Sequence, residues 1–238
     1  MALPVIEHLT ELRRRLFIAM AAIGLAAIVV FFFYSHILTW LQHPYCKAVR
    51  HRQANSCNFL VTSPLDPFAI RLQVATYGGF ILASPIVFWQ LWRFVAPGLK
   101  STERRYAVPF MVSSVLLFTF GGLIAYLTFP KALGFLVQIG GPSLDVRLDP
   151  TKYLGLILLM ILAFGVSFEF PVFLVFLELV GVLSSAKLSQ WRRPAIVVIV
   201  IFAAVITPSQ DPYSLFAMAG PMYIFYEASI LIGRFLKK

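Results

Sequence analysis

Charged residues are scarce in this sequence, and the common catalytic and metal-binding motifs are missing from it. Only 13% of the 238 residues are Asp, Glu, Lys or Arg, whereas 60% are hydrophobic. There is no glycine-rich phosphate loop, no HExxH and no Cys/His cluster with metal-ligand spacing. The four histidines do not pair by spacing with a serine nucleophile and an acid. A soluble domain of this length does not need so much apolar material, so we predict an all-α polytopic membrane protein.

Six apolar runs predict six membrane spans in a single domain that covers residues 1–238. The expected spans are 16–40, 68–94, 106–129, 153–183, 194–207 and 214–233. The first run is too long for a cleaved signal peptide, so we expect it to remain as a span. The run 194–207 is short, since roughly 14 residues give about 21 Å of helix against a hydrocarbon core of about 30 Å, and 214–233 is only slightly better once Pro221 and Glu227 are considered. Either the bilayer thins around this pair or the pair is a partly re-entrant hairpin.

Several residues predict local features of these helices. Residues 2–15 have apolar positions at helical spacing, which indicates an amphipathic helix leading into the first span. Asp66 is a natural N-cap, and Pro67 suits the first helical position of the second span. Arg71 lies one turn inside this span and is expected to snorkel outward. Pro85 predicts a kink in the same span.

The distribution of basic residues predicts the topology. The amino-terminal arm, the second and fourth loops and the carboxyl-terminal tail hold 13 Lys and Arg residues, and the other three loops hold six. The positive-inside rule therefore places both termini in the cytoplasm. Cys46 and Cys57 then face the exoplasmic side, where disulfides persist. A bond between them would contribute about 3 kcal/mol in the chain-entropy model, and two unpaired thiols are the alternative.

One carboxylate falls near the centre of the fourth span. A charge at the depth of Glu169 costs ~2.5–3.5 kcal/mol on insertion scales, which indicates a functional residue. Gly165, one turn earlier on the same face, leaves room for water or a ligand. Pro171 cannot donate to the carbonyl of Ser167, so a bend should expose polar backbone beside the acid. The alternative is that Glu169 is protonated, hydrogen-bonds to a neighbouring helix and has only a structural role. Glu178, near the end of the span, is expected to snorkel.

The acids Glu7, Glu11 and Glu103 are isolated on an otherwise basic cytoplasmic face. Glu11 has Arg14 and Arg15 at i+3 and i+4, so an intrahelical ion pair is one explanation for it. Glu103 begins the third span, where an acid interacts favourably with the helix dipole. Because a basic face repels cations, a cationic ligand would have to be bound by these acids at close range.

Six stretches of the chain, in order, resemble the TatC family. They are EHLTELRRRL (7–16), SPLDPF (63–68), PIVFWQLW (85–92), PGLKSTERR (97–105), FGVSFEFP (164–171) and TP (207–208). Each stretch alone is a weak signal, but their order and spacing match from about residue 5 to 233. One departure is Leu215 after Ser214, where the family commonly has Gln, following a turn one residue longer than usual. A polar contact from position 215 to a partner helix is therefore not expected.

The resemblance implies the integral receptor of the twin-arginine translocation system, in the prokaryotic cytoplasmic (inner) membrane. That system exports folded proteins with the proton-motive force. The implied partners are TatA- and TatB-type single-span proteins, twin-arginine signal peptides, further copies of the chain and the lipid bilayer, with no nucleic acid, cofactor or enzyme activity. The implied signal-peptide residues are Glu11, Arg15, Phe94, Pro97, Leu99, Glu103, Arg104 and Arg105. Glu169 and Gln90 would lie in a concave cavity formed by kinked helices, and Pro85, Pro171, Asp66 and Asp211 would be structural.

Two other classes of function compete with this interpretation. A small proton-coupled secondary transporter could use Glu169 as its proton carrier, but transporters usually show internal repeats. Spans one to three show no similarity to spans four to six. An intramembrane enzyme would need a second catalytic group at the depth of Glu169. The candidate nucleophiles Ser113, Ser114 and Ser167 have no base except Glu169 itself.

Overall fold

The computed structural model describes residues 3–49, 59, 61, 63–95, 104–139 and 149–236. All regular elements in these ranges are helices, as predicted. They are α1 (Leu3–Phe32), α2 (Tyr34–Val49), α3 (Asp66–Val95), the 3-10 helix η2 (Arg104–Tyr106), α4 (Ala107–Ile139), α5 (Pro150–Ser167), α6 (Phe170–Leu179), α7 (Ser185–Gln190), α8 (Arg192–Ile206) and α9 (Pro212–Leu236).

Five segments of the described chain are long and apolar enough to cross a membrane. They are His8–Phe32, Asp66–Val95, Ala107–Ile139, Pro150–Leu179 and Pro212–Phe235. The remaining predicted span corresponds to α8, whose 15 residues reach only about 22 Å. The expectation of a short span at 194–207 therefore agrees with the helix found there. The same expectation for 214–233 was wrong, because α9 has 25 residues.

Two helix boundaries differ from the sequence prediction. The first predicted span ran to residue 40, but the helix breaks at Phe33, where α1 ends and the separate helix α2 begins. The amphipathic arm is continuous with α1 rather than a separate helix. The third predicted span ended at 129, but α4 continues through Pro130 to Ile139. Burial of Leu133 and Val137 continues the packed stripe beyond the proline, so tertiary packing extends the helix.

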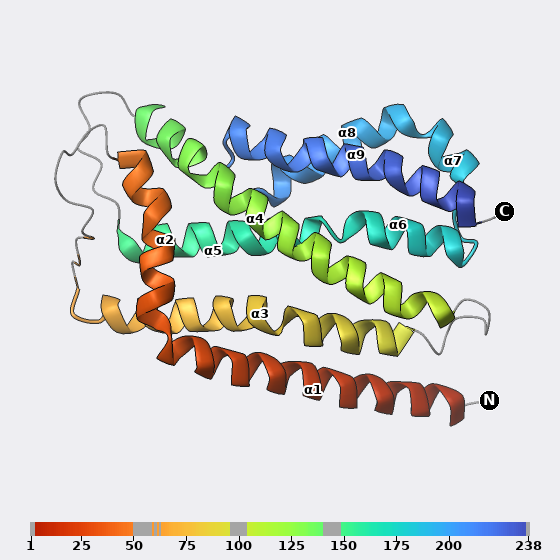
Figure 1. Cartoon of the computed structure of the whole chain (residues 1–238), viewed down its shortest axis with the longest axis horizontal. Helices are drawn as coiled ribbons and strands as arrows, with labels where there is room; N and C mark the ends of the chain where they lie inside the picture. The colour runs from red at the N-terminus through yellow and green to blue at the C-terminus, as the bar shows by residue number, and fades with distance from the viewer. Residues whose placement is uncertain are drawn as a thin grey trace.

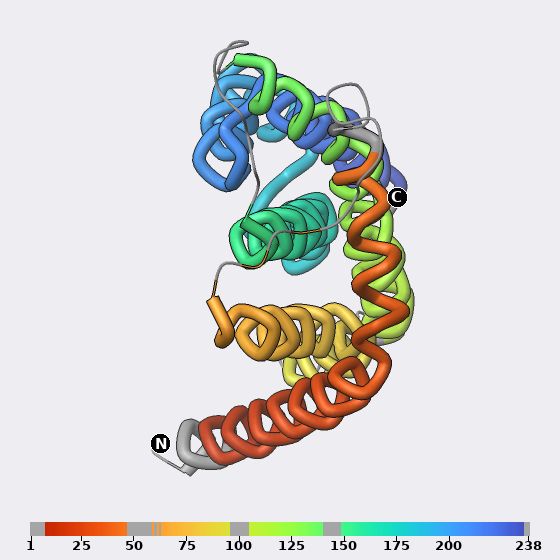
Figure 2. The backbone as a smooth tube through the Cα atoms, turned by 90° about the vertical axis from the view of Figure 1, so that its left-hand side faces the viewer, coloured from red at the N-terminus to blue at the C-terminus, as the bar shows by residue number. Residues whose placement is uncertain are grey.

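The long helices run roughly side by side, and α4 crosses the others obliquely (Figure 1). Helix α1 packs along α3, α4 packs on α5, and α9 packs on α6 and α8. Viewed at 90° to this, the helices follow a C-shaped arc from α1 through α3 and α4 to α8 and α9 (Figure 2). Helices α5 and α6 lie on the inner side of the arc. The two chain ends lie at the same end of the molecule (Figure 1).

Glycines allow close approach at two helix crossings. A Cβ atom at Gly79 of α3 would lie 2.7 Å from backbone atoms of Ala27 in α1. One at Gly121 of α4 would lie 2.6 Å from the carbonyl oxygen of Phe164 in α5. Small residues at helix interfaces are the usual route to tight packing in membranes, where lipid tails are as apolar as the side chains. These two contacts position α1 on α3 and α4 on α5.

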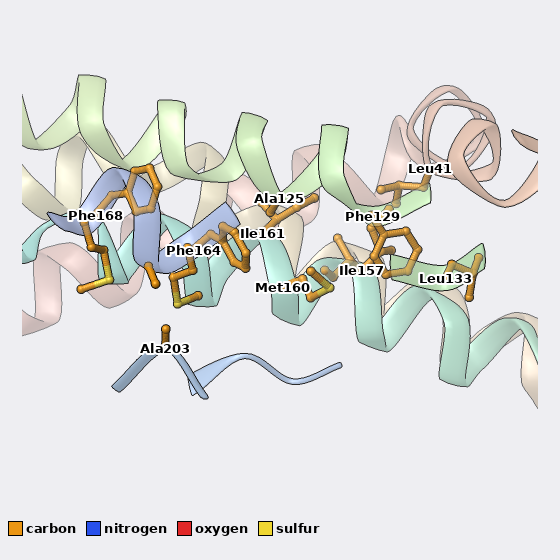
Figure 3. Packing of buried hydrophobic residues seen from close by; sticks show 14 of the residues in the cluster. Leu41, Ala125, Phe129, Leu133, Ile157, Met160, Ile161, Phe164, Phe168 and Ala203 are labelled. Atoms are coloured by element: carbon orange, nitrogen blue, oxygen red, sulfur yellow. The ribbon is translucent and has the colours of Figure 1, made fainter. Parts of the chain in front are cut away.

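The core lies between α4 and α5 and extends to α8 and α9. Figure 3 shows Ala125 and Phe129 of α4 facing Ile157 and Ile161 of α5, with Ala203 of α8 below them. Phe164 at this interface is fully buried. The arrangement explains why Pro150–Leu179, which contains α5 and α6, is the most buried candidate span in the described chain. The helix that carries the chain towards Glu169 is thus also the central helix of the fold.

Arg71 of α3 contacts the end of α1, next to the break before α2. Its Nε and Nη2 atoms donate to the carbonyl oxygen of Phe31 at 3.2 and 3.1 Å. The guanidinium also lies 4.2 Å from the centre of the Phe31 ring. Carbonyls in the last turn of a helix have no helical partner, and a cation there complements the helix dipole. The end of α1 thus offers the Arg71 guanidinium a partner, and its expected snorkelling to the membrane surface stays a prediction.

Two aspartates lie at the starts of long helices. Asp66 accepts from the backbone N–H of Ser63 at 2.8 Å. Asp66 therefore acts as the third helical residue (N3) of a capping box, whose N-cap is Ser63. The sequence had predicted Asp66 itself as the N-cap. Asp211 is buried and accepts from the N–H of Ser214 at 2.8 Å, immediately before Pro212 opens α9. This arrangement matches an N-cap followed by proline at the first helical position.

The structure describes one of the two cysteines. Cys46, in the last turn of α2, is disulfide-bonded. Cys57 is the only other cysteine in the sequence, and it lies outside the described residues. The Cys46–Cys57 pairing stays a prediction.

Candidate functional site

Part of the predicted signal-peptide patch lies in the described chain. Glu11 and Arg15 are on α1, and Phe94 is in the last turn of α3. The predicted residues Pro97, Leu99 and Glu103 lie outside the described residues, and only the helical backbone of Arg104 is described. Arg105 is exposed in η2, where its Nη2 atom donates to the hydroxyl of Tyr106 at 2.8 Å. The site is therefore built here from its α1 and α3 components.

Glu11 forms an ion pair within its own helix. The Nε atom of Arg15 lies 3.0 Å from Oε1 of Glu11, and Nη2 of Arg15 donates to the same oxygen. Of the two arginines that the sequence offered, the one at i+4 makes the contact, while the side chain of Arg14 is exposed. His8 and Arg93 are also close enough to Glu11 to attract its charge.

A ring contact joins the amino-terminal arm to the end of α3. The imidazole of His8 stacks on the phenyl ring of Phe94, with centroids 4.4 Å apart and planes inclined by 21°. His8 lies one turn before Glu11 on the same helix face. The stack therefore brings Glu11 beside Phe94, although the two residues are far apart in the sequence. We call His8, Glu11, Arg15, Arg93 and Phe94 the Glu11 site.

The sequence did not predict the His8 contact. His8 was considered only as a possible catalytic histidine, because a ring pair between distant segments leaves no periodic signal. Glu11 and Glu103, at the start of the third predicted span, would meet most directly if the first span packed against the third. In the structure α1 packs instead along α3, the second span. The Glu11 site thus includes the end of α3, and Glu103 lies outside the described residues.

Glu169 lies where the chain breaks between α5 and α6. It has helical dihedral angles of φ −74° and ψ −17°, and its side chain makes no capping hydrogen bond to α6. Pro171 follows in the first turn of α6, at the place where the sequence predicted a bend. The break places a carboxyl group inside the segment Pro150–Leu179, about 15 Å along the helix from Leu179.

A short chain of polar groups leads to Glu169. The indole N–H of Trp92 on α3 donates to Oγ of Ser114 on α4 at 3.0 Å. The Ser114 hydroxyl lies close to the Glu169 carboxyl. Among the described residues, the Oε1 atom of Glu169 is buried and has no hydrogen-bond partner. Sequence analysis noted Ser114 at this depth but could not connect it to Trp92.

One predicted neighbour of Glu169 lies differently from expectation. Gly165 was expected to leave room for water or a ligand, but a Cβ there would lie 2.8 Å from the ring of Phe118. Phe118 fills that space, so Gly165 serves close packing. The placement of Gln90 of α3 in the same cavity as Glu169 stays a prediction.

Glu178 is buried, contrary to the prediction that it snorkels. Its exposed fraction is 1%, and its carboxyl group occupies the space that Gly233 of α9 leaves open. A Cβ atom at Gly233 would overlap this carboxyl. The sequence showed Glu178 near the end of a span but not that a glycine on another helix receives it.

A cavity of about 340 Å³ lies between α4, α6 and α9. Its walls are almost entirely apolar, and Tyr106, Ser113 and Ser229 are its hydroxyl-bearing residues. Glu169 does not line it, although Pro171 and Val172 do. The concave cavity expected around Glu169 is therefore distinct from this one. A second cavity lies at the α8–α9 turn and is lined by Ala204, Thr207, Gln210, Asp211, Pro212 and Leu215.

The arrangement suits binding rather than catalysis. In the described part of the chain no group of three or more His, Cys, Asp or Glu side chains is placed to hold a metal ion. The Glu11 site combines a carboxylate with an aromatic ring, which together match the charge and the planar face of a guanidinium. Glu169 can accept a hydrogen bond inside the membrane-spanning part of the chain.

Comparison with known proteins gives a consistent result. Residues 7–221 match the family model described as Sec-independent protein translocase protein (TatC). The TatC proteins of Frankia casuarinae and Corynebacterium kroppenstedtii are 41% and 35% identical in sequence to this chain, and both alignments cover 97% of it. The chain spans 65% and 61% of their lengths. The TatC of Aquifex aeolicus is 34% identical over 98% of this chain and 95% of its own length.

Two solved structures resemble the fold over nearly its whole length. A crystal structure of the twin-arginine translocase receptor TatC aligns with a TM-score of 0.77 and 33% identity, covering 97% of this chain and all of that one. A second, described as the same receptor in DDM, gives 0.77 and 34%, covering 95% and 99%. Matches in sequence and in structure therefore cover the same extent of the chain.

Proposed function

The chain belongs to the TatC family of Sec-independent protein translocase proteins, and from this premise we propose that it is the signal-peptide receptor of a twin-arginine translocase. The family is one of membrane-embedded translocase components, not of enzymes. In this proposal the chain lies in a prokaryotic cytoplasmic membrane and acts as a homo-oligomer. It recruits TatA- and TatB-type single-span proteins, and the proton-motive force drives export of folded cargo.

The Glu11 site carries the proposal. The His8 stack holds the helix that carries the Glu11 carboxylate against the end of α3, which carries the Phe94 ring, on a surface otherwise rich in arginine. Two adjacent arginines on a peptide present planar forks that carboxylates can meet bidentately, whereas lysine offers a hydrated point charge. We assign one peptide arginine to Glu11 and the other to Glu103. The residues Pro97, Leu99, Arg104 and Arg105 complete the same patch.

The proposed topology has six spans with both termini in the cytoplasm. Five helices have the length and composition for crossing, and α8 would be the short sixth span. The exposed side chains of Lys187, Arg193 and Arg234 put basic residues at the chain-end side of the molecule. The position of both chain ends on one side supports this assignment (Figure 1). Bilayer thinning near α8 would match its length.

Peptide affinity tests the proposal directly. Glu11→Ala and Glu103→Ala should each weaken binding of a twin-arginine peptide about tenfold to a hundredfold, the worth of a charge-assisted hydrogen bond of ~1.5–3 kcal/mol. Wild-type protein should prefer Arg-Arg to Lys-Lys, and the double variant should lose that preference. Glu227→Ala is the control, because Glu227 pairs with Arg192 at 2.8 Å outside the Glu11 site. A double variant that still prefers Arg-Arg by the wild-type margin would contradict the assignment.

The transporter alternative finds less support around Glu169. A proton carrier needs a chain of groups that can both accept and donate protons. The polar neighbour of Glu169 is Ser114, whose hydroxyl accepts from the indole N–H of Trp92. Indole nitrogen is a donor only, so it cannot pass a proton onward. We therefore place Glu169 in the receptor as a polar contact inside the membrane.

A further inference from the structure

The apolar cavity between α4, α6 and α9 is a crevice that opens on the outer side of the arc. Helix α6 lies on the inner side, so it forms the floor, and α4 and α9 form the walls (Figure 2). Val172 and Val175 on the floor are only 5% and 7% exposed. Pro109 on α4 and Ile232 on α9 are exposed and mark the mouth. We call this space the α4–α6–α9 crevice.

The mouth of the crevice faces lipid. All three helices belong to segments that are long and apolar enough to span a membrane. The side chains beside the mouth, such as Val108 and Val112 on α4 and Leu231 on α9, are apolar and exposed. Because the crevice lies near the start of α4 and the end of α9, it is close to the end of the molecule that carries both chain ends (Figure 1). In the proposed topology this is the cytoplasmic leaflet.

Water is a poor occupant of this crevice. A buried water needs about three polar partners. Two of the hydroxyl-bearing residues in the wall are already engaged, because Ser229 donates to the carbonyl oxygen of Tyr226 at 2.7 Å and Tyr106 accepts from Arg105 at 2.8 Å. An empty crevice would forfeit the dispersion contacts of its walls, at a cost that grows with its volume. An apolar occupant therefore suits it best.

The volume decides which apolar occupant fits. A helix with its side chains is about 10–12 Å across, so 340 Å³ would hold only about 3–4 Å of its length, which is less than one turn. A single hydrocarbon chain is less than half as wide as a helix and follows an elongated groove. The crevice therefore matches a lipid tail rather than a membrane-spanning helix.

A cation lies at the end of the crevice that is closest to the chain ends. Tyr106 lines the crevice, and the Arg105 guanidinium lies 4.9 Å from the centre of the Tyr106 ring. Arg105 makes no ion pair with another described residue. Its bond to the Tyr106 hydroxyl engages one of the five N–H groups, so the guanidinium can still bind a phosphate through two donors.

We propose that the α4–α6–α9 crevice binds one acyl chain of an anionic phospholipid, with its phosphate on Arg105. Every phospholipid carries the phosphate, so the net charge of the headgroup decides between them. A choline group would add a cation beside a surface that already exposes Lys187, Arg193 and Arg234, whereas basic residues at the membrane surface attract anionic lipids. Because Arg105 also belongs to the proposed peptide patch, lipid binding rather than transport is the quantity to measure.

Photo-crosslinking tests occupancy in the wild-type protein. The protein is reconstituted into phosphatidylcholine vesicles that contain a small fraction of phosphatidylglycerol with a diazirine on its acyl chain, and adducts are located by mass spectrometry. Val172 and Val175 should be labelled. Leu174 on the same helix is equally buried, at 6%, but lies outside the crevice and should not be labelled. Labelling of exposed side chains such as Leu116 with none at Val172 and Val175 overturns the proposal.

A variant that fills the crevice tests the same site. Ala228→Leu adds a side chain inside the crevice, whereas Gly220→Leu adds one to α9 where a Cβ meets nothing within 4 Å. Labelling at Val172 and Val175 should fall about fourfold or more in Ala228→Leu, because each displaced methylene is worth about fourfold in affinity. It should stay unchanged in Gly220→Leu. Equal labelling in both variants overturns the proposal, and the wild-type experiment remains decisive if Ala228→Leu does not fold.

Arg105→Gln tests the headgroup contact. Detergent-purified protein is offered equal amounts of phosphatidylglycerol and phosphatidylcholine, and the retained lipid is identified by native mass spectrometry. Wild type should prefer phosphatidylglycerol about fivefold, and Arg105→Gln should lose most of this preference. Arg193→Gln removes an exposed cation outside the crevice and should keep it. Equal retention of the two lipids by wild type, or an unchanged preference in Arg105→Gln, overturns the proposal.

A protein neighbour is the competing occupant. If co-expressed single-span partners abolish the adducts at Val172 and Val175, or if Ala228→Leu changes the oligomeric state, the crevice is a protein interface and the proposal is wrong. Failure of the wild-type protein to bind a twin-arginine peptide would contradict the receptor function but leave the lipid site unaffected. The two failures are therefore distinguishable.

Discussion

Tyr126 donates its phenolic proton to the carbonyl oxygen of Trp40 at 3.0 Å. In a helix that oxygen would accept from the residue four positions later, but this residue is Pro44, which has no N–H. The Tyr126 and Trp40 rings also stack, with centroids 4.0 Å apart and planes inclined by 3°. A side chain from α4 thus satisfies the backbone group that a proline leaves open in α2, and it fixes α2 against α4.

This relationship predicts coupling between Tyr126 and Pro44. Tyr126→Phe keeps the ring stack but removes the donor, so the free energy of unfolding should fall by about 0.5–1.5 kcal/mol. Pro44→Ala restores an N–H to the helix and gives the Trp40 carbonyl a partner. In that background Tyr126→Phe should cost less, and thermal unfolding of the four proteins in detergent measures the difference. Equal costs in both backgrounds would show that the carbonyl does not depend on Tyr126.

A second prediction concerns the packing of α1 on α3. Gly79→Ala places a methyl group 2.7 Å from the backbone of Ala27, which cannot move without shifting the helix. The variant should lose about 1–3 kcal/mol of stability from overpacking. Peptide binding should weaken as well, because displacing α1 separates His8 from Phe94. Both quantities are measured on the purified protein, by thermal unfolding and by peptide titration.

Gly24 supplies the control for Gly79. It lies on α1, and a Cβ there would meet nothing within 4 Å. Gly24→Ala should therefore stabilise the helix by about 0.5–1 kcal/mol, since glycine is a poor helix former. If Gly79→Ala behaves like Gly24→Ala, the close contact between the helices is not a constraint on the fold.

Composition and local pattern predicted the helical class and the break beside Pro171. These features depend on the chain's own apolar content and on proline chemistry, both of which are visible in one segment. The length of α8 was predicted for the same reason. By contrast, the start of α2 was missed because Phe33 ends α1 without a glycine or proline to mark the break.

Tertiary contacts explain the remaining errors. Glu178 is buried because Gly233 on another helix leaves a space for its carboxyl group. The space beside Gly165 is filled by the ring of Phe118 from α4. Arg71 donates to the carbonyl of Phe31, which lies 40 positions earlier in the sequence. The stack of His8 on Phe94 likewise joins segments that share no local signal. Each depends on which helices are neighbours, and a single sequence does not encode that in its periodicity.

The proposed topology predicts which positions an impermeant thiol reagent reaches in intact cells. After Cys46 and Cys57 are replaced by serine, cysteines introduced at Lys187 and Arg234 should resist labelling until the membrane is opened. Lys152, exposed near the start of α5, is the positive control and should label at once. Strong labelling of intact cells at Lys187 would overturn the assignment of both termini to the cytoplasm.

The ion pair in the Glu11 site predicts that Arg15 competes with the peptide. Its guanidinium occupies the carboxylate that we assign to a peptide arginine. An exposed i,i+4 pair is worth only ~0.3–0.5 kcal/mol, so an incoming arginine can displace it at a cost of about twofold in affinity. Arg15→Gln should therefore strengthen twin-arginine peptide binding about twofold beyond the effect of Arg14→Gln, which removes the same charge without breaking the pair. Isothermal titration of the two variants at equal ionic strength gives the ratio. If Arg15→Gln binds the peptide no better than Arg14→Gln, the pair does not restrain Glu11. If Arg15→Gln binds more weakly, Arg15 contacts the peptide directly or orients Glu11 for it, and the competition between the two guanidinium groups is excluded.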